Sequence, residues 1–110
     1  MARTLGIDVS HYQRDVNWPA VASSEVEFCF IKATERTAWV DDYFERNWRA
    51  AQDVGLFRGA YHFARVGADA KAQAAHFFSV VGGLGFRDLP PVLDLEDADG
   101  HSPAHVKKLI

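Results

Sequence analysis

Short apolar runs alternate with amphipathic segments along the chain, and this pattern predicts strands alternating with helices. Strands are predicted at residues 4–10, 27–33, 56–63 and 90–96. Helices are predicted as a short turn after Asn17, from Asp41 or Asp42 to about Val54, from Asp69 to about Val81, and from Ser102–Pro103 onward. Such alternation is typical of a parallel sheet covered by helices, so the predicted fold class is α/β.

Length narrows the possible architectures. The chain has 110 residues, of which 48% are hydrophobic and 13% aromatic, enough to build one domain with a core. A complete (β/α)8 barrel typically needs about 250 residues. The predicted units therefore fit either a small doubly wound sheet or part of a barrel, and periodicity alone does not separate the two.

Charge and cysteine content exclude several classes of protein. The net charge is −3 and no basic cluster occurs, which argues against a nucleic-acid partner. Cys29 is the only cysteine, so we expect no disulfide framework, and its apolar run predicts a buried side chain. No apolar stretch approaches the roughly 18 residues of a membrane span, and residues 1–4 do not resemble a signal peptide.

Two carboxylates stand at the end of the fourth predicted strand, in the run Asp94-Leu95-Glu96. Alternation along a strand places Asp94 and Glu96 on one face, about 7 Å apart at Cα, and Leu93 and Leu95 on the other, where helices should cover them. Active sites of α/β proteins form at such strand ends, and close carboxylates raise one pKa. The pattern predicts paired-acid chemistry such as glycoside hydrolysis. The alternative is a solvated acidic loop.

Other side chains are predicted to share this edge. Asp8 lies near the end of the first strand and should converge with the two acids, unless it only caps the strand end. Lys32 interrupts an apolar strand, so we expect it to pair with these acids. Tyr61 and Phe63 share one face of the third strand, where they could stack against sugars or simply pack in the core.

The run His101-Ser-Pro-Ala-His105 offers a competing interpretation. Histidines four residues apart can bind a metal. The run also resembles the His-Ser-x-x-His motif of zinc polysaccharide deacetylases. That family carries adjacent acids in an early strand, whereas the first strand here offers only Asp8, so this remains the weaker alternative.

Several motifs together resemble glycoside hydrolase family 25, the Chalaropsis-type lysozymes or N-acetylmuramidases. They occur in order over nearly the whole chain. The matching stretches are residues 6–13 (GIDVSHYQ), 28–35 (FCFIKATE), 42–47 (DYFERN), 59–64 (GAYHFA), 73–74 (QA) and 91–96 (PVLDLE).

This resemblance implies a barrel of five βα units with three further strands. It implies hydrolysis, with retention, of the β-1,4 bond between N-acetylmuramic acid and N-acetylglucosamine in peptidoglycan, with no metal or other cofactor. Glu96 would be the general acid, Asp94 would orient the substrate's acetamido group or act directly, and Asp8 would be a further active-site acid. The sugar groove would be lined by Lys32, Tyr61 and Phe63.

The chain departs from the family pattern in two ways. Arg36 replaces a glycine that usually follows the Thr-Glu of the second strand, so that loop is expected to run differently. The family's barrel needs nearly twice this length, so residues 1–110 are interpreted as its N-terminal half. We therefore expect self-association through open barrel edges, and a non-catalytic, glycan-binding remnant is the alternative to an active muramidase. The chain does not indicate a location, although the family acts on the cell wall.

Overall fold

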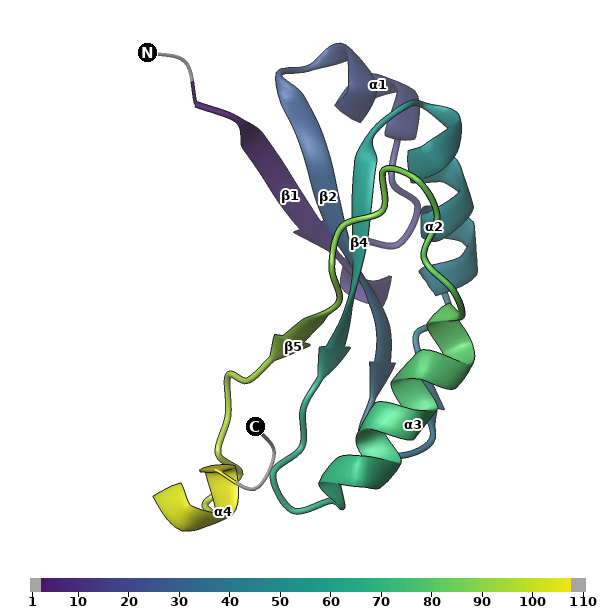
Figure 1. Cartoon of the computed structure of the whole chain (residues 1–110). Helices are drawn as coiled ribbons and strands as arrows, with labels where there is room; N and C mark the ends of the chain where they lie inside the picture. Colours follow the sequence, from purple (N-terminus) through teal and green to yellow (C-terminus); the bar gives the residue numbers. More distant parts are fainter. Residues whose placement is uncertain (1–2, 108–110) are drawn as a thin grey trace.

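The computed structural model describes residues 3–107, apart from the side chain of His105. It shows strands alternating with helices (Figure 1). The strands are β1 (Leu5–Val9), β2 (Val26–Glu35), β3 (Trp39–Val40), β4 (Phe57–Phe63) and β5 (Val92–Asp94). The helices are the 3₁₀ turn η1 (His11–Gln13), α1 (Trp18–Ser23), α2 (Phe44–Asp53), α3 (Ala70–Val81) and α4 (Pro103–Lys107).

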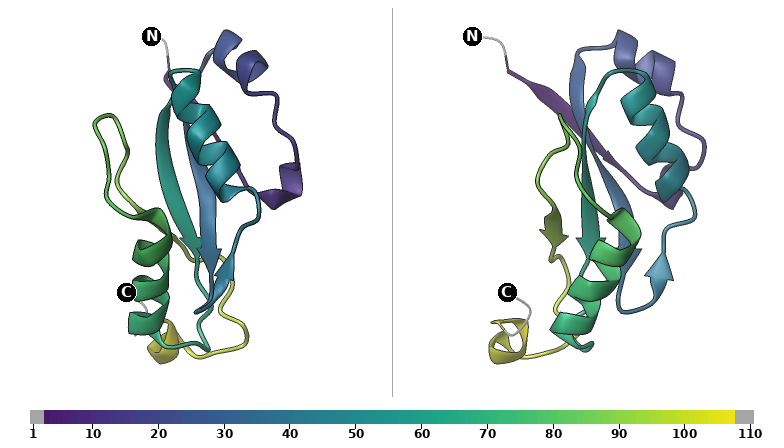
Figure 2. Two further views of the ribbon diagram at one scale, coloured as in Figure 1. Left: turned by 90° about the vertical axis from the view of Figure 1, so that its right-hand side faces the viewer. Right: turned by 45° about the vertical axis from the view of Figure 1, so that its right-hand side comes forward.

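The strands form one open sheet in the order β1-β2-β4-β5, and every neighbouring pair in this order is parallel. Helices α1, α2 and α3 cover one face of it (Figures 1 and 2). This confirms the α/β class and the predicted partial barrel. Within residues 3–107, β1 and β5 are the outer strands; self-association through them stays a prediction.

Local sequence signals set most of the helix ends. The side chain of Asn17 accepts a hydrogen bond from the Ala20 N–H, and Asp69 accepts one from the Ala72 N–H, so both cap their helices as predicted. Gly55 and Gly82 end α2 and α3 in the positive-φ conformation that favours glycine.

The start of α2 differs from the prediction. Its N-cap is Tyr43, which caps with its backbone alone, and neither Asp41 nor Asp42 takes that place. Instead, Asp41 organises the turn before the helix: its Oδ1 accepts from the Tyr43 N–H at 2.9 Å, and its carbonyl accepts from the Phe44 N–H. The side chain of Asp41 is buried and serves a second purpose, described below.

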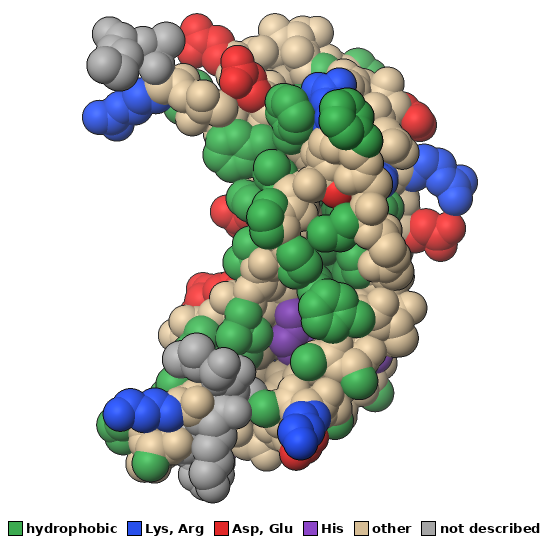
Figure 3. Space-filling model, in the orientation of Figure 1, with side chains coloured by type: hydrophobic (Ala, Val, Ile, Leu, Met, Phe, Trp, Pro, Cys, Tyr) green, Lys and Arg blue, Asp and Glu red, His purple; other side chains and the backbone are tan. Residues whose placement is uncertain are grey.

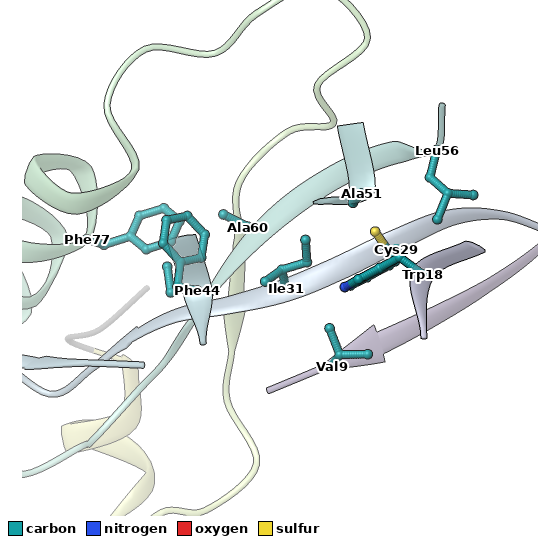
Figure 4. Packing of buried hydrophobic residues seen from close by; sticks show 10 residues of the cluster. Val9, Trp18, Cys29, Ile31, Phe44, Ala51, Leu56, Ala60 and Phe77 are labelled. Carbon is teal, nitrogen blue, oxygen red and sulfur yellow. The ribbon is translucent and has the colours of Figure 1, made fainter. Parts of the chain in front are cut away.

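The core lies between the sheet and the helices (Figure 4). Alternate residues of β2, among them Cys29, Ile31 and Ala33, are fully buried there. Burial also raises the pKa of the Cys29 thiol to about 12, so this cysteine is the small apolar core residue that its sequence context predicts. Phe44 from α2 and Phe77 from α3 complete the packing against the sheet.

The opposite face of the sheet carries large side chains, and two glycines make room for them. A Cβ on Gly6 would lie 2.0 Å from the Phe28 ring, and one on Gly59 would lie 2.5 Å from the Phe30 ring. Each glycine is the register partner of the phenylalanine whose ring crosses it. Figure 3 shows hydrophobic side chains gathered along the hollowed flank of the molecule.

Several strand bounds correct the sequence interpretation. β2 continues through Glu35, and the short antiparallel β3 pairs with its end, which the sequence did not predict. β5 ends at Asp94, so Glu96 lies beyond the strand. The prediction that helices cover Leu93 is wrong for the described residues, because 45% of Leu93 is exposed.

Candidate active site

The predicted acids meet at the carboxyl ends of the parallel strands. Asp8 from β1, Asp94 from β5 and Glu96 just after it line one open cavity of about 450 Å³. Phe30 and Tyr61 lie between them on β2 and β4. The register explains this convergence, because Asp8 aligns with Phe30 and Tyr61 aligns with Val92, two residues before Asp94.

Asp94 is the acid whose protonation is most strongly changed. Partial burial raises the pKa of Asp94 to about 6, assisted by a hydrogen bond with Glu96 and by the negative charges of Glu96 and Asp8. Two carboxylates that share a site cannot both ionise freely, so the pair retains a proton at a pH where an isolated aspartate has lost it. The cavity therefore holds, in Asp94, a carboxylic acid that can act as a proton donor.

Tyr61 is half-buried in the same cavity, with its hydroxyl held neutral. Burial raises the pKa of Tyr61, and the charges of Asp8, Asp94, Asp41 and Glu96 raise it further. The phenol is therefore a hydrogen-bond donor across the neutral range. The contribution of Asp41 also shows that this aspartate lies within electrostatic range of the cavity.

Lys32 points from β2 to the same face but does not pair with the predicted acids, which corrects that expectation. Its Nζ binds the Glu35 carboxylate at 2.7 Å, and it lies 4.7 Å from the Trp39 ring centre and 4.9 Å from that of Phe63. The residue is buried. Its charge still lowers the pKa of Asp94, although this is a minor effect beside the burial.

Glu35 continues this polar network away from the acids. Burial alone would raise the pKa of Glu35, but hydrogen bonds from Lys32 and Arg65 outweigh it and the pKa is lowered. Arg65 binds Glu35 at 2.8 Å and Asp99 at 3.0 Å, and its guanidinium lies 5.0 Å from the Phe63 ring centre. The predicted groove residue Phe63 is thus half-buried between two cations.

Arg36 follows Glu35 and adopts a φ of 55°, the left-handed conformation that glycine takes without strain. The backbone therefore accepts arginine in a glycine-like conformation. The different course that the arginine predicts for this loop stays a prediction, and the positive φ places strain on a non-glycine residue.

A buried network around His62 fixes the segment after β4. The Gln73 Nε2 donates to the carbonyls of Arg65 and Ala68, so its Oε1 must accept, from the Arg65 N–H and from the His62 Nε2 at 2.8 Å. His62 Nδ1 then accepts from the Thr34 hydroxyl at 2.7 Å. Burial lowers the pKa of His62, which keeps it neutral in this arrangement. These contacts give the histidine a structural role.

His11 and Asp41 form a pair at this edge that the sequence did not predict. The Asp41 Oδ2 accepts hydrogen bonds from the His11 backbone N–H at 2.9 Å and from the Nδ1 at 2.8 Å. The two residues are thirty positions apart. The family-like motif at residues 6–13 was the only signal in the sequence for the position of His11 at this edge. Nothing in the sequence indicated that Asp41 is its partner.

The metal alternative gains no support from the described residues. Within residues 3–107, no group of three or more His, Cys, Asp or Glu side chains is arranged to hold a metal ion. His101 lies against Gly67, where a Cβ would stand 2.9 Å from its Nε2. The His105 side chain lies outside the described residues, so the predicted His101–His105 pair has no described geometry.

Comparison with known proteins identifies the family. The profile "Glycosyl hydrolases family 25" matches residues 7–110. The chain belongs to this family. It is 46% identical to "Lysozyme M1" of Streptomyces globisporus over 90% of this chain and 33% of that protein. It is 37% identical to an "N,O-diacetylmuramidase" of a Chalaropsis species, over 90% of this chain and 49% of the relative.

A solved structure supports the same assignment. A family 25 glycosyl hydrolase from Bacillus anthracis superposes with a TM-score of 0.88 at 36% identity, over 94% of this chain and 49% of that one. The chain thus spans half or less of these relatives. Among the described residues, no helix has the length and apolar character needed to cross a membrane.

Proposed function

We propose that this chain carries the acid groups of a peptidoglycan muramidase, which hydrolyses the β-1,4 bond between N-acetylmuramic acid and N-acetylglucosamine. The observation that carries the proposal is the placement of Asp94, hydrogen-bonded to Glu96, in a cavity that Glu96 and Asp8 also line. Paired carboxylic acids of this kind are the groups that glycoside hydrolysis requires.

The two acids differ in exposure, and this difference assigns their roles. Asp94 is half-buried at the strand end, whereas Glu96 lies beyond it and is exposed. Glu96 is therefore the acid that reaches the glycosidic oxygen. It gives its proton to that oxygen as the bond from the oxygen to the anomeric carbon breaks, and the bonding electrons leave with the oxygen.

The remaining groups support this step. Asp94 is hydrogen-bonded to Glu96 and faces the sugar, where it can orient the acetamido group or act on the anomeric carbon directly. The Asp8 carboxylate stabilises positive charge that develops on the sugar ring. Water finally adds to the anomeric carbon and returns a proton to Glu96. We propose that Tyr61, which lines the cavity, and its neighbours Lys32 and Phe63 form the sugar groove beside these acids.

Clearance of a bacterial wall suspension tests the proposal. The Glu96→Gln variant removes the proton donor and should slow clearance by at least about 10²–10⁴-fold. Glu25→Gln makes the same change at an exposed site before β2, at the opposite edge of the sheet, and should not slow it. The wild-type rate should fall as the pH rises through about 6, because the acid pair then loses its proton.

Product analysis completes the test. New reducing ends on muramic acid, detected by mass spectrometry after borohydride reduction, identify the predicted bond. Clearance that Glu96→Gln leaves unchanged would remove Glu96 from its role. Wall binding without release of products by the wild-type chain would support the non-catalytic alternative.

A further inference from the structure

An exposed group of aromatic rings lies at the same edge of the sheet as the acids, and none of the steps above uses it. We call it the Tyr12 patch, formed by the rings of His11, Tyr12 and Trp39. Tyr12 is 80% exposed and Trp39 is 40% exposed. His11 connects them: its ring centre lies 4.4 Å from that of Tyr12, at 31°, and 5.1 Å from that of Trp39, at 66°. One face of Tyr12 therefore packs on His11, and most of the side chain is open to solvent.

The protein holds these rings in place from below. His11 is fixed by the buried Asp41, which receives both its backbone and its ring N–H. The Tyr12 backbone N–H donates to the hydroxyl of Ser10, which caps η1. The rings are therefore ordered before any ligand arrives, which lowers the entropic cost of binding.

Trp39 is anchored from the other side. It lies in β3, paired with Glu35 at the end of β2, and its carbonyl accepts from the His76 Nε2 at 2.9 Å. The Lys32 Nζ lies 4.7 Å from the centre of its ring. These three contacts hold the Trp39 ring in a defined position although it is exposed to solvent.

The patch lies at the edge of the sheet where the parallel strands end, as the acids do. Its residues His11 and Tyr12 lie in η1, which begins two residues after β1, the strand that carries Asp8. Its Trp39 lies in β3, which pairs with the end of β2. The patch and the acids therefore lie at the same edge of the sheet.

The chemistry of the patch selects an uncharged sugar ring. Aromatic faces pack against the apolar face of a pyranose, while the Tyr12 hydroxyl and the His11 Nε2 offer hydrogen bonds to its hydroxyls. The nearby Asp8 and Asp41 carboxylates disfavour an anionic ligand. The Lys32 charge does not reverse this, because Glu35 neutralises it.

We propose that the Tyr12 patch binds a neutral N-acetylated sugar unit of a glycan strand, next to the unit held at the acids. This inference rests on the proposed function for the identity of the strand, but it concerns binding and not hydrolysis. Binding and hydrolysis can therefore be tested separately, and either can fail without the other.

The test is titration of the whole chain with chitotetraose, an uncharged oligomer of N-acetylglucosamine, followed by tryptophan fluorescence and calorimetry. Tyr12→Ala should weaken binding by roughly two- to tenfold, the range for loss of one aromatic contact. Tyr12→Phe keeps the ring and should retain most of the affinity. Phe86→Ala removes another ring, 94% exposed in the segment between α3 and β5, and should have no effect.

Each result decides the proposal. In the Glu96→Gln variant binding should persist, so failed hydrolysis does not affect this test. If wild-type protein with a native circular dichroism spectrum does not bind chitotetraose, the proposal is wrong. It is also wrong if Tyr12→Ala and Phe86→Ala bind equally well, or if Tyr12→Ala only changes the oligomeric state in light scattering, which would make the patch a contact between copies.

Discussion

Replacing Asp94 by asparagine should stabilise the chain at neutral pH and not at acidic pH. Asp94 is partly buried next to Glu96 and Asp8, and these surroundings disfavour its charged form. Asparagine has nearly the same shape, still donates a hydrogen bond towards Glu96, and carries no charge. The substitution thus removes an electrostatic cost of the site while it keeps the packing.

The size of the effect follows from the pKa of Asp94, which rises from 3.8 to about 6 on folding. The folded chain binds this proton more tightly than the unfolded chain, so the stabilising contribution is complete below pH 3.8 and is lost as the pH rises through about 6. A shift of this size corresponds to about 3 kcal/mol if fully expressed. Because Asp94 is partly exposed, solvent screening reduces the expected gain to roughly 1–2 kcal/mol.

Urea denaturation followed by circular dichroism measures this gain. The difference in unfolding free energy between Asp94→Asn and wild type should be more favourable to the variant at about pH 7.5 than at about pH 3.5, by that amount. Asp42→Asn, at an exposed position outside the cavity, controls for the change in net charge. An equal difference at both pH values, or a variant that is less stable at neutral pH, would refute the argument.

Two further substitutions test a buried ion pair and a strained turn in the structure around the site. Asp88→Asn should lower the free energy of unfolding by about 3–5 kcal/mol in urea denaturation at neutral pH, because it leaves the buried Arg58, 2.8 Å away, without its counter-charge. The Arg58 hydrogen bond holds the pKa of Asp88 low despite burial, so this loss should shrink as the pH falls below 3.8. A loss that does not depend on pH would contradict this origin. Arg36→Gly should raise the free energy of unfolding by about 0.5–1 kcal/mol, because glycine adopts the positive φ without strain; this gain is what remains after the greater entropy of glycine in the unfolded chain. Arg36→Ala should not raise it. Equal effects of glycine and alanine would exclude backbone strain as the cause.

Alternation along the strands predicted most of the site, because it is a local property. The positions of Asp8, Asp94 and Tyr61 followed from strand parity and from the rule that parallel strands present their carboxyl ends at one edge. The structure places them around one cavity. Their catalytic roles stay predictions, since position at an edge does not assign chemistry.

The partner of Lys32 was not predictable by the same reasoning. The predicted strand ended at Ala33, but β2 continues to Glu35, and its register with β4 is irregular between Lys32 and Thr34. An irregularity of this kind breaks the simple alternation of faces. It allows Glu35, three residues on, to reach Lys32, where the regular pattern predicted pairing with acids from other strands.

The Asp41–His11 pair shows a second limit. Thirty residues separate the two, and their meeting depends on how η1 and the turn before α2 are placed by the tertiary structure. The sequence predicts Asp41 as a possible helix cap, because aspartate before an amphipathic segment is a typical capping signal. Its backbone environment instead turns the carboxylate towards both Tyr43 and His11.

The two faces of β2 carry different kinds of side chain. Cys29, Ile31 and Ala33 contact the helices and are completely buried, so changes there alter packing and the free energy of unfolding. Phe30 and Lys32 point to the other face, towards the acid cavity and its aromatic neighbours. A polar residue on that face costs stability unless it is paired, and Lys32 is retained there with its own counter-ion. The Glu35 carboxylate therefore accounts for the buried charge of Lys32 on the face of the sheet without helices.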